Sequence, residues 1–92
     1  MAERRVVVGS TVGLHARPAA LFVQAASRQP VPVWIAKPGQ DRADARSILS
    51  VLALDARGGD EVVLSAEGEG ADVVLDELAE LVTQNLDKEE VG

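Results

Sequence analysis

The sequence contains no cysteine, which excludes disulfide bonds and thiolate metal sites. It also has no tyrosine, one tryptophan and one phenylalanine, so we do not expect the aromatic platforms that stack single-stranded nucleic acid. No apolar run approaches the roughly 20 residues that span a membrane, and no signal-peptide pattern is visible. These absences predict a cytoplasmic protein that does not insert into membranes.

Basic residues are also scarce. Nine lysines and arginines stand against 15 acidic residues, which gives a formal charge of −6 and disfavours binding to a phosphate backbone. One histidine without cysteine offers too few strong ligands for a metal, and we expect no cofactor. The 92 residues predict a single domain over 1–92, with residues 87–92 as a flexible tail.

Apolar residues alternate between strand-like runs and helical spacing along the chain. The resulting order, βαββαβα, predicts an α+β fold in which three helices cover one face of a sheet in a two-layer sandwich. The expected strands are Arg4–Val8, Val31–Ala36, Arg42–Ala45 and Glu61–Glu67, and the expected helices are Ala16–Ser27, Ile48–Ala53 and Ala71–Leu86.

His15 is the candidate for chemistry, in the segment Gly13–Ala20 (GLHARPAA). It stands where a loop enters a helix, and the free N–H groups of a helix start attract anions. Arg17, two residues on, adds a positive charge with forked donors. A neutral imidazole can attack a phosphoryl group, which these donors would then stabilise. By spacing alone, a surface or structural histidine is the competing interpretation.

The segment Gly13–Ala20 closely resembles the active-site motif of HPr, the histidine-containing phosphocarrier family of the phosphoenolpyruvate-dependent sugar phosphotransferase system. The length, the element order, Ser47–Leu49 and Val63–Gly68 extend the resemblance over nearly the whole chain. It implies an open-faced β-sandwich whose antiparallel strands have the order 1-4-2-3. It also implies that His15 is phosphorylated on Nδ1, with Arg17 and the backbone N–H groups of Ala16 and Arg17 stabilising the phosphoryl group.

The resemblance also implies partners. Phosphorylated enzyme I would be the donor and the IIA components of sugar permeases the acceptors. Because such a protein must be recharged by another protein, we expect a carrier rather than a stand-alone enzyme. We also expect a monomer.

Ser47 precedes the apolar residues of the second expected helix, a pattern typical of an N-cap. In some members of the family a serine here is phosphorylated by a dedicated kinase, which blocks transfer from enzyme I and allows binding to a transcription regulator. Many members keep the serine without the kinase, so we favour the cap over a regulatory site.

An apolar surface near His15 is expected to dock partners, although some of its residues could instead belong to the core. The resemblance favours six contact residues for this surface: Ala20, Leu21, Gln24, Ile48, Leu49 and Leu52.

Two features depart from the family pattern. The turn Lys37–Asp41 is one residue longer than in common members, and Gln24 stands where some carry lysine. The residue at position 24 bears on the identity of the partners and not on the chemistry. Two alternatives also stay open beside the sugar-transport carrier. One is a regulatory binding module, and the other is a paralogue that serves nitrogen regulation or a dihydroxyacetone kinase.

Overall fold

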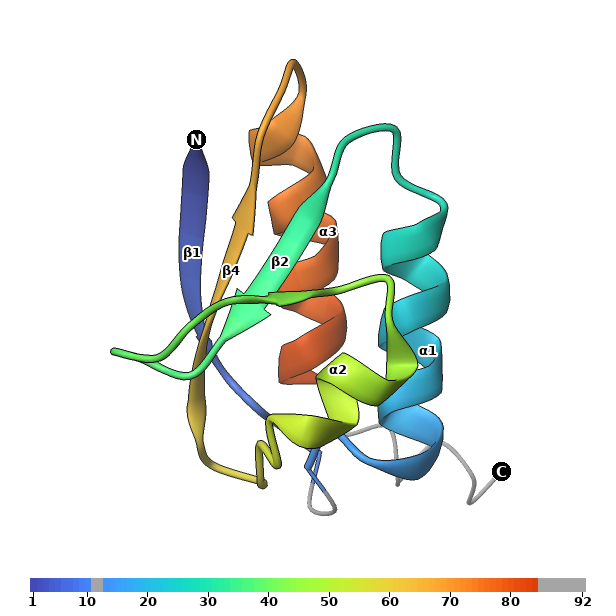
Figure 1. The fold of residues 1–92 in the computed structure, drawn as a ribbon, viewed down its shortest axis with the longest axis vertical. Coiled ribbons are helices and arrows are strands. Elements are labelled where there is room, and N and C mark those ends of the chain that lie inside the picture. The colour runs from blue at the N-terminus through green and yellow to red at the C-terminus, as the bar shows by residue number, and fades with distance from the viewer. Residues whose placement is uncertain (11–12, 85–92) are drawn as a thin grey trace.

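The computed structural model describes residues 1–10 and 13–84 and folds as two layers, a four-stranded sheet and three helices (Figure 1). The predicted flexible tail at residues 87–92 lies outside the described residues. The elements follow the predicted order: β1 (Ala2–Val7), α1 (Ala16–Ser27), β2 (Val33–Ala36), β3 (Ala43–Asp44), α2 (Ile48–Ala53), β4 (Glu61–Ala66) and α3 (Ala71–Thr83).

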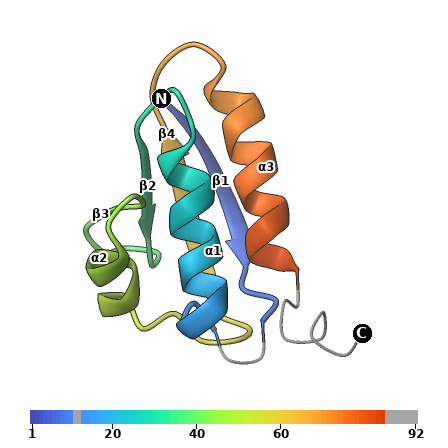
Figure 2. The same ribbon diagram turned by 90° about the vertical axis from the view of Figure 1, so that its right-hand side faces the viewer.

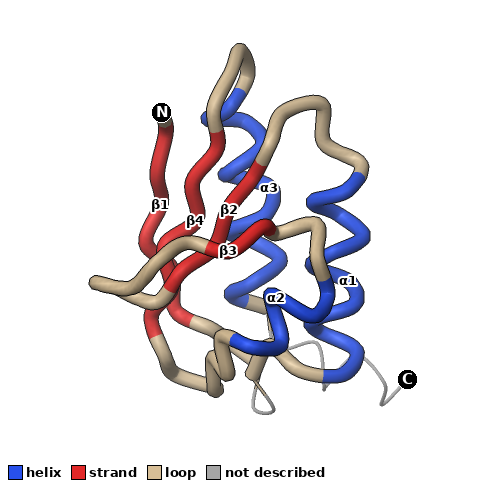
Figure 3. Tube along the Cα trace, in the orientation of Figure 1, coloured by secondary structure: helices blue, strands red, loops and turns tan. Residues whose placement is uncertain are grey.

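The sheet has the order β1-β4-β2-β3 with every pair antiparallel, which confirms the expected topology. Figure 3 shows β1, β4 and β2 side by side and β3 as a short edge strand. Leu64 of β4 lies at the centre, opposite Arg4 of β1 on one side and Ile35 of β2 on the other. The sheet therefore joins segments from both halves of the chain.

The helices cover one face of the sheet, where α1 and α3 run alongside each other and α2 lies beside α1 (Figure 2). The core between the layers is fully buried, and Phe22 of α1 has an exposed fraction of 0%. The opposite face is open, and there the Arg42 guanidinium lies 3.9 Å from the centroid of the half-buried Trp34 ring. This arrangement confirms the predicted open-faced sandwich.

The predicted bounds of α1 and α2 match the structure, while other ends differ for local reasons. The second strand begins at Val33 instead of Val31, because Pro32 has no N–H to donate to the ladder. The last helix ends at Thr83 instead of Leu86, because Gln84 adopts an extended backbone with ψ 146°. The first strand begins two residues early, at Ala2, because Ala2 still pairs with Ala66.

Arg46 fixes the position of α2 against α1. Its Nη2 atom donates to the carbonyl oxygens of Gln29, at 2.9 Å, and Val31, at 3.0 Å, just beyond the end of α1. These carbonyls have no partner within a helix, so the guanidinium both satisfies them and holds the start of α2 beside α1.

Candidate functional site

His15 is the N-cap of α1 and has an extended backbone, with φ −132° and ψ 166°. Its side chain is 36% exposed and makes no capping hydrogen bond to the helix. The preceding residue, Leu14, is buried, and its N–H donates to the Ala56 carbonyl at 2.8 Å. Leu14 thus anchors the loop in the core, and the next side chain, the imidazole, reaches solvent.

Gly13 brings this loop onto the backbone that follows α2. Its φ is +76°, and an added Cβ would stand 2.3 Å from the Ala56 carbonyl oxygen and 2.7 Å from the Arg57 Cα. A residue with a side chain would therefore meet both a left-handed backbone and a collision with main-chain atoms. Glycine at this position lets two distant loops touch and sets where His15 stands.

Ala16 begins α1 with a φ of +49°, which is unusual for a residue with a Cβ. A left-handed conformation costs a non-glycine residue about 1–2 kcal/mol. Strained backbone of this kind is concentrated at functional sites. This strain lies directly beside His15. It falls on the residue whose backbone N–H group the family resemblance assigns to stabilising the phosphoryl group.

Arg17 is exposed in the first turn of α1, at the same helix start as His15. The first N–H groups of a helix have no carbonyl partner within it and carry the positive end of the helix dipole. A nucleophilic ring, from His15, and positive charge, from the first-turn N–H groups and Arg17, therefore lie together at the start of α1.

Asp55 contacts His15 although it lies outside the histidine motif. Its Oδ1 atom lies 3.2 Å from Nε2 of His15, and its Oδ2 atom accepts from Nη2 of Arg57 at 3.2 Å. The hydrogen bond and charge of Arg57 lower the pKa of the Asp55 carboxyl, with a smaller lowering from His15. The carboxyl is thus ionised at neutral pH, can only accept hydrogen bonds, and requires the proton on Nε2.

Sequence reasoning missed Asp55 and Arg57, because the contact joins residues 40 positions apart. The only feature near them in the sequence that could have indicated this site is an aspartate just after a short helix. Asp55 follows the C-cap Leu54 with a φ of +53°, a conformation that aspartate tolerates better than most residues.

Ser47 is the N-cap of α2, as predicted. Its Oγ accepts from the Ser50 N–H at 3.3 Å, and its carbonyl accepts the first helical bond from Val51 at 3.0 Å. The side chain is half-buried. The capping role is confirmed, and phosphorylation of Ser47 stays a prediction.

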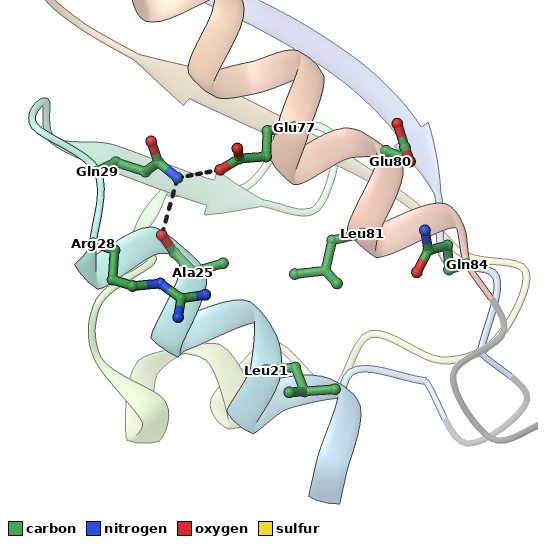
Figure 4. A pocket seen from close by; sticks show the side chains of 8 residues that line it. All are labelled: Leu21, Ala25, Arg28, Gln29, Glu77, Glu80, Leu81 and Gln84. Carbon is green, nitrogen blue, oxygen red and sulfur yellow. Dashed lines mark hydrogen bonds between the residues drawn. The ribbon is translucent and has the colours of Figure 1, made fainter. Parts of the chain in front are cut away.

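The predicted partner residues lie on two sides of α1. Leu49 on α2 is the most exposed of them, at 77%, and Ile48 is exposed beside it. Leu52 packs partly against the core. Leu21 faces the other way, into a groove between α1 and α3, whereas α2 packs on the opposite side of α1 (Figures 2 and 4). Of the remaining two, Ala20 is half-buried and Gln24 is exposed.

The groove between α1 and α3 is separate from His15. Its lining includes Leu21, Leu81 and Gln84, and Gln29 spans its far end by donating to the Ala25 carbonyl and to Glu77 (Figure 4). The imidazole instead stands on the open surface, where a large partner can reach it. Among residues 1–10 and 13–84 the structure has no helix long and apolar enough to cross a membrane, and no group of three metal-ligating side chains.

Residues 2–84 match the family model described as the PTS HPr component phosphorylation site. The chain belongs to the HPr phosphocarrier family. It is 52% identical to the phosphocarrier protein HPr of Streptomyces coelicolor, over 96% of this chain and 95% of the relative. It is 40% identical to the HPr-like protein Crh of Bacillus subtilis, over 94% of this chain and 100% of the relative.

Solved structures agree with this assignment. The crystal structure of an HPr phosphocarrier protein from Bacillus anthracis has a TM-score of 0.83 and 38% identity, over 88% of this chain and 95% of that one. The sheet order and the helices of this chain are thus those of an HPr fold.

Proposed function

We propose that this chain carries a phosphoryl group on Nδ1 of His15, accepting it from phosphorylated enzyme I and donating it to IIA components of sugar transport. The observation that carries the proposal is the partly exposed His15 ring at the N-cap of α1, beside Arg17 in the first turn of that helix. Nε2 is engaged by Asp55, so Nδ1 is the nitrogen left to react.

The positive charge at the start of α1 supports phosphorylation at Nδ1. A phosphoryl group on Nδ1 brings negative charge to a helix start, where backbone N–H groups and the dipole favour anions. We assign the backbone of Ala16 and the guanidinium of Arg17 to stabilising this group. The side chain of His15 is 36% exposed. This exposure suits transfer between two proteins, because both must bring their reacting atoms to the same nitrogen.

The docking surface is proposed to combine Leu21, Gln24 and Ala20 of α1 with Ile48, Leu49 and Leu52 of α2. Exposed apolar side chains such as Leu49 supply the contact area that a transient protein interface needs. Monomeric behaviour and a cytoplasmic location fit a carrier that must visit several proteins, and we propose both.

Incubation with enzyme I and phosphoenolpyruvate, followed by intact mass measurement, tests the relay. We expect a single adduct with the mass of one phosphoryl group, which is lost in acid and absent in His15→Ala. An adduct that survives this substitution, or none in the wild type, would refute the relay.

A regulatory role is the second candidate. It is favoured by the similarity to Crh, described as the catabolite repression HPr of Bacillus subtilis, and by the position of Ser47 at the start of an exposed helix. A phosphate on Ser47 would sit beside the first N–H groups of α2 and would change the charge of the docking surface. An acid-stable adduct on Ser47, without onward transfer from His15, would favour this role. The acceptor proteins would separate a sugar carrier from a nitrogen-regulation paralogue.

A further inference from the structure

The contact between His15 and Asp55 joins the histidine motif to a residue outside it. The side chains come from different segments, one at the start of α1 and the other just after α2, and Oδ1 lies 3.2 Å from Nε2. The carboxylate is in turn held by Arg57 through its other oxygen, also at 3.2 Å. A ring nitrogen, a carboxylate and a guanidinium thus form a chain across the surface.

We propose that Asp55 is a positioning residue for phosphoryl transfer, which holds the proton on Nε2 of His15 and keeps the lone pair of Nδ1 free. The proposal rests on the proposed function, because it assigns Asp55 a role in the reaction at that same site. The hydrogen bond also limits rotation of the ring, because Nε2 must stay directed at the carboxylate.

The proton on Nε2 stays in place through a complete cycle. When Nδ1 attacks, its lone pair forms the N–P bond, the bond between phosphorus and the donor breaks, and the donor keeps that electron pair. The ring then carries a positive charge, with hydrogen on Nε2 and the phosphoryl group on Nδ1. Onward transfer breaks the N–P bond and returns the pair to Nδ1, which leaves the neutral ring still protonated on Nε2.

Asp55 acts in both halves of this cycle. In the free protein it favours the Nε2–H tautomer, which presents a lone pair at Nδ1. In the phosphorylated protein the ring becomes cationic, and the carboxylate that lies 3.2 Å from Nε2 in this structure would stabilise that cation as an opposite charge at hydrogen-bond distance. Arg57 keeps the carboxylate in place, since a second donor fixes the orientation of an exposed side chain.

Substitution by glycine tests this role without harming the fold. Asp55 has a φ of +53°, a conformation that glycine adopts without strain, so Asp55→Gly removes the carboxylate and keeps the backbone. Asp55→Asn keeps the side-chain shape but loses the charge. Glu67→Gln is the control, because it removes one exposed negative charge just after β4, at the end of the sheet opposite the start of α1 (Figure 1).

The first measurement is the ring ¹⁵N chemical shifts of unphosphorylated protein, which report the tautomer of His15. We expect the wild type and Glu67→Gln to carry hydrogen on Nε2, and Asp55→Gly to show an increased share of hydrogen on Nδ1. Identical shifts in all three proteins would overturn the proposal. This measurement needs no phosphoryl donor, so it gives a result even if the relay itself is wrong.

The second measurement is the rate of phosphorylation by enzyme I and phosphoenolpyruvate. From the usual strength of exposed ion pairs, we expect Asp55→Gly and Asp55→Asn to lower kcat by roughly three- to fivefold with little change in KM. A raised KM with an unchanged kcat would place Asp55 in the docking surface and overturn the proposal. A wild-type protein that accepts no phosphoryl group would refute the proposed function, whatever the tautomer.

Discussion

Replacing Gly13 by alanine tests whether the loop that carries His15 is held by direct contact with the backbone after α2. The added Cβ would stand 2.3 Å from the Ala56 carbonyl oxygen, far inside the contact distance of carbon and oxygen. Because main-chain atoms cannot rotate away as a flexible side chain does, one of the two loops must move. Gly39→Ala is the matched control, since its φ of +79° is close to the +76° of Gly13 and nothing lies within 4 Å of its added Cβ.

Both variants lose folding stability through backbone strain, and only Gly13→Ala loses more through steric overlap. A left-handed alanine costs about 1–2 kcal/mol in each variant. The entropy lost by the unfolded chain is the same in both and cancels in the comparison. Overpacking at Gly13 adds about 1–3 kcal/mol. For a domain of this size 1 kcal/mol lowers Tm by about 4–8 °C, so we expect Gly13→Ala to melt about 4–24 °C below Gly39→Ala.

Thermal unfolding followed by circular dichroism measures the difference. The spectrum of each variant at low temperature serves to confirm that both still fold. Equal melting temperatures for Gly13→Ala and Gly39→Ala would refute the reasoning, because they would show that the loops do not touch as closely as the structure has them.

Three further predictions concern the site. Ser47→Ala should lower the free energy of unfolding by about 1 kcal/mol because the N-cap is lost, which a thermal melt measures. Ser47→Asp should keep the cap and slow phosphorylation by enzyme I, which a rate measurement shows. Arg17→Ala should reduce phosphoryl transfer much more than Tm, because an exposed arginine adds little stability; a matched loss of both would contradict this. Because Arg57 and His15 lower the pKa of Asp55, its contribution to stability is present above pH 3.8 and lost as the pH falls through the lower folded value. The difference in Tm between the wild type and Asp55→Asn should therefore shrink in that acid range, and a difference that grows there would count against the ion pair.

Local patterns predicted the parts of the fold that local physics controls. The apolar spacing placed α1, and a serine before an apolar run placed α2, with the same bounds as the structure. The order of the strands came from the family resemblance and not from the pattern, because strand pairing depends on contacts between distant segments. The early start of β1 has the same cause, since only its pairing with Ala66 makes Ala2 part of the sheet.

The site was predicted to the extent that it lies within one segment. His15, Ala16 and Arg17 are neighbours in the sequence, so a motif can identify them. Asp55 belongs to a loop 40 residues away, and no spacing rule connects it with His15. The division of the docking residues was missed for a similar reason, because only the packing of α3 against α1 shows that Leu21 lines a groove there.

The position of the phosphoryl group is the most direct test of the account. Protein labelled with ¹⁵N and charged by enzyme I and phosphoenolpyruvate can be examined by phosphorus and nitrogen NMR, which distinguish the two ring nitrogens. We predict one phosphohistidine signal coupled to Nδ1 of His15, with hydrogen retained on Nε2 beside Asp55. A phosphoryl group on Nε2, or one found only on Ser47, would contradict the account.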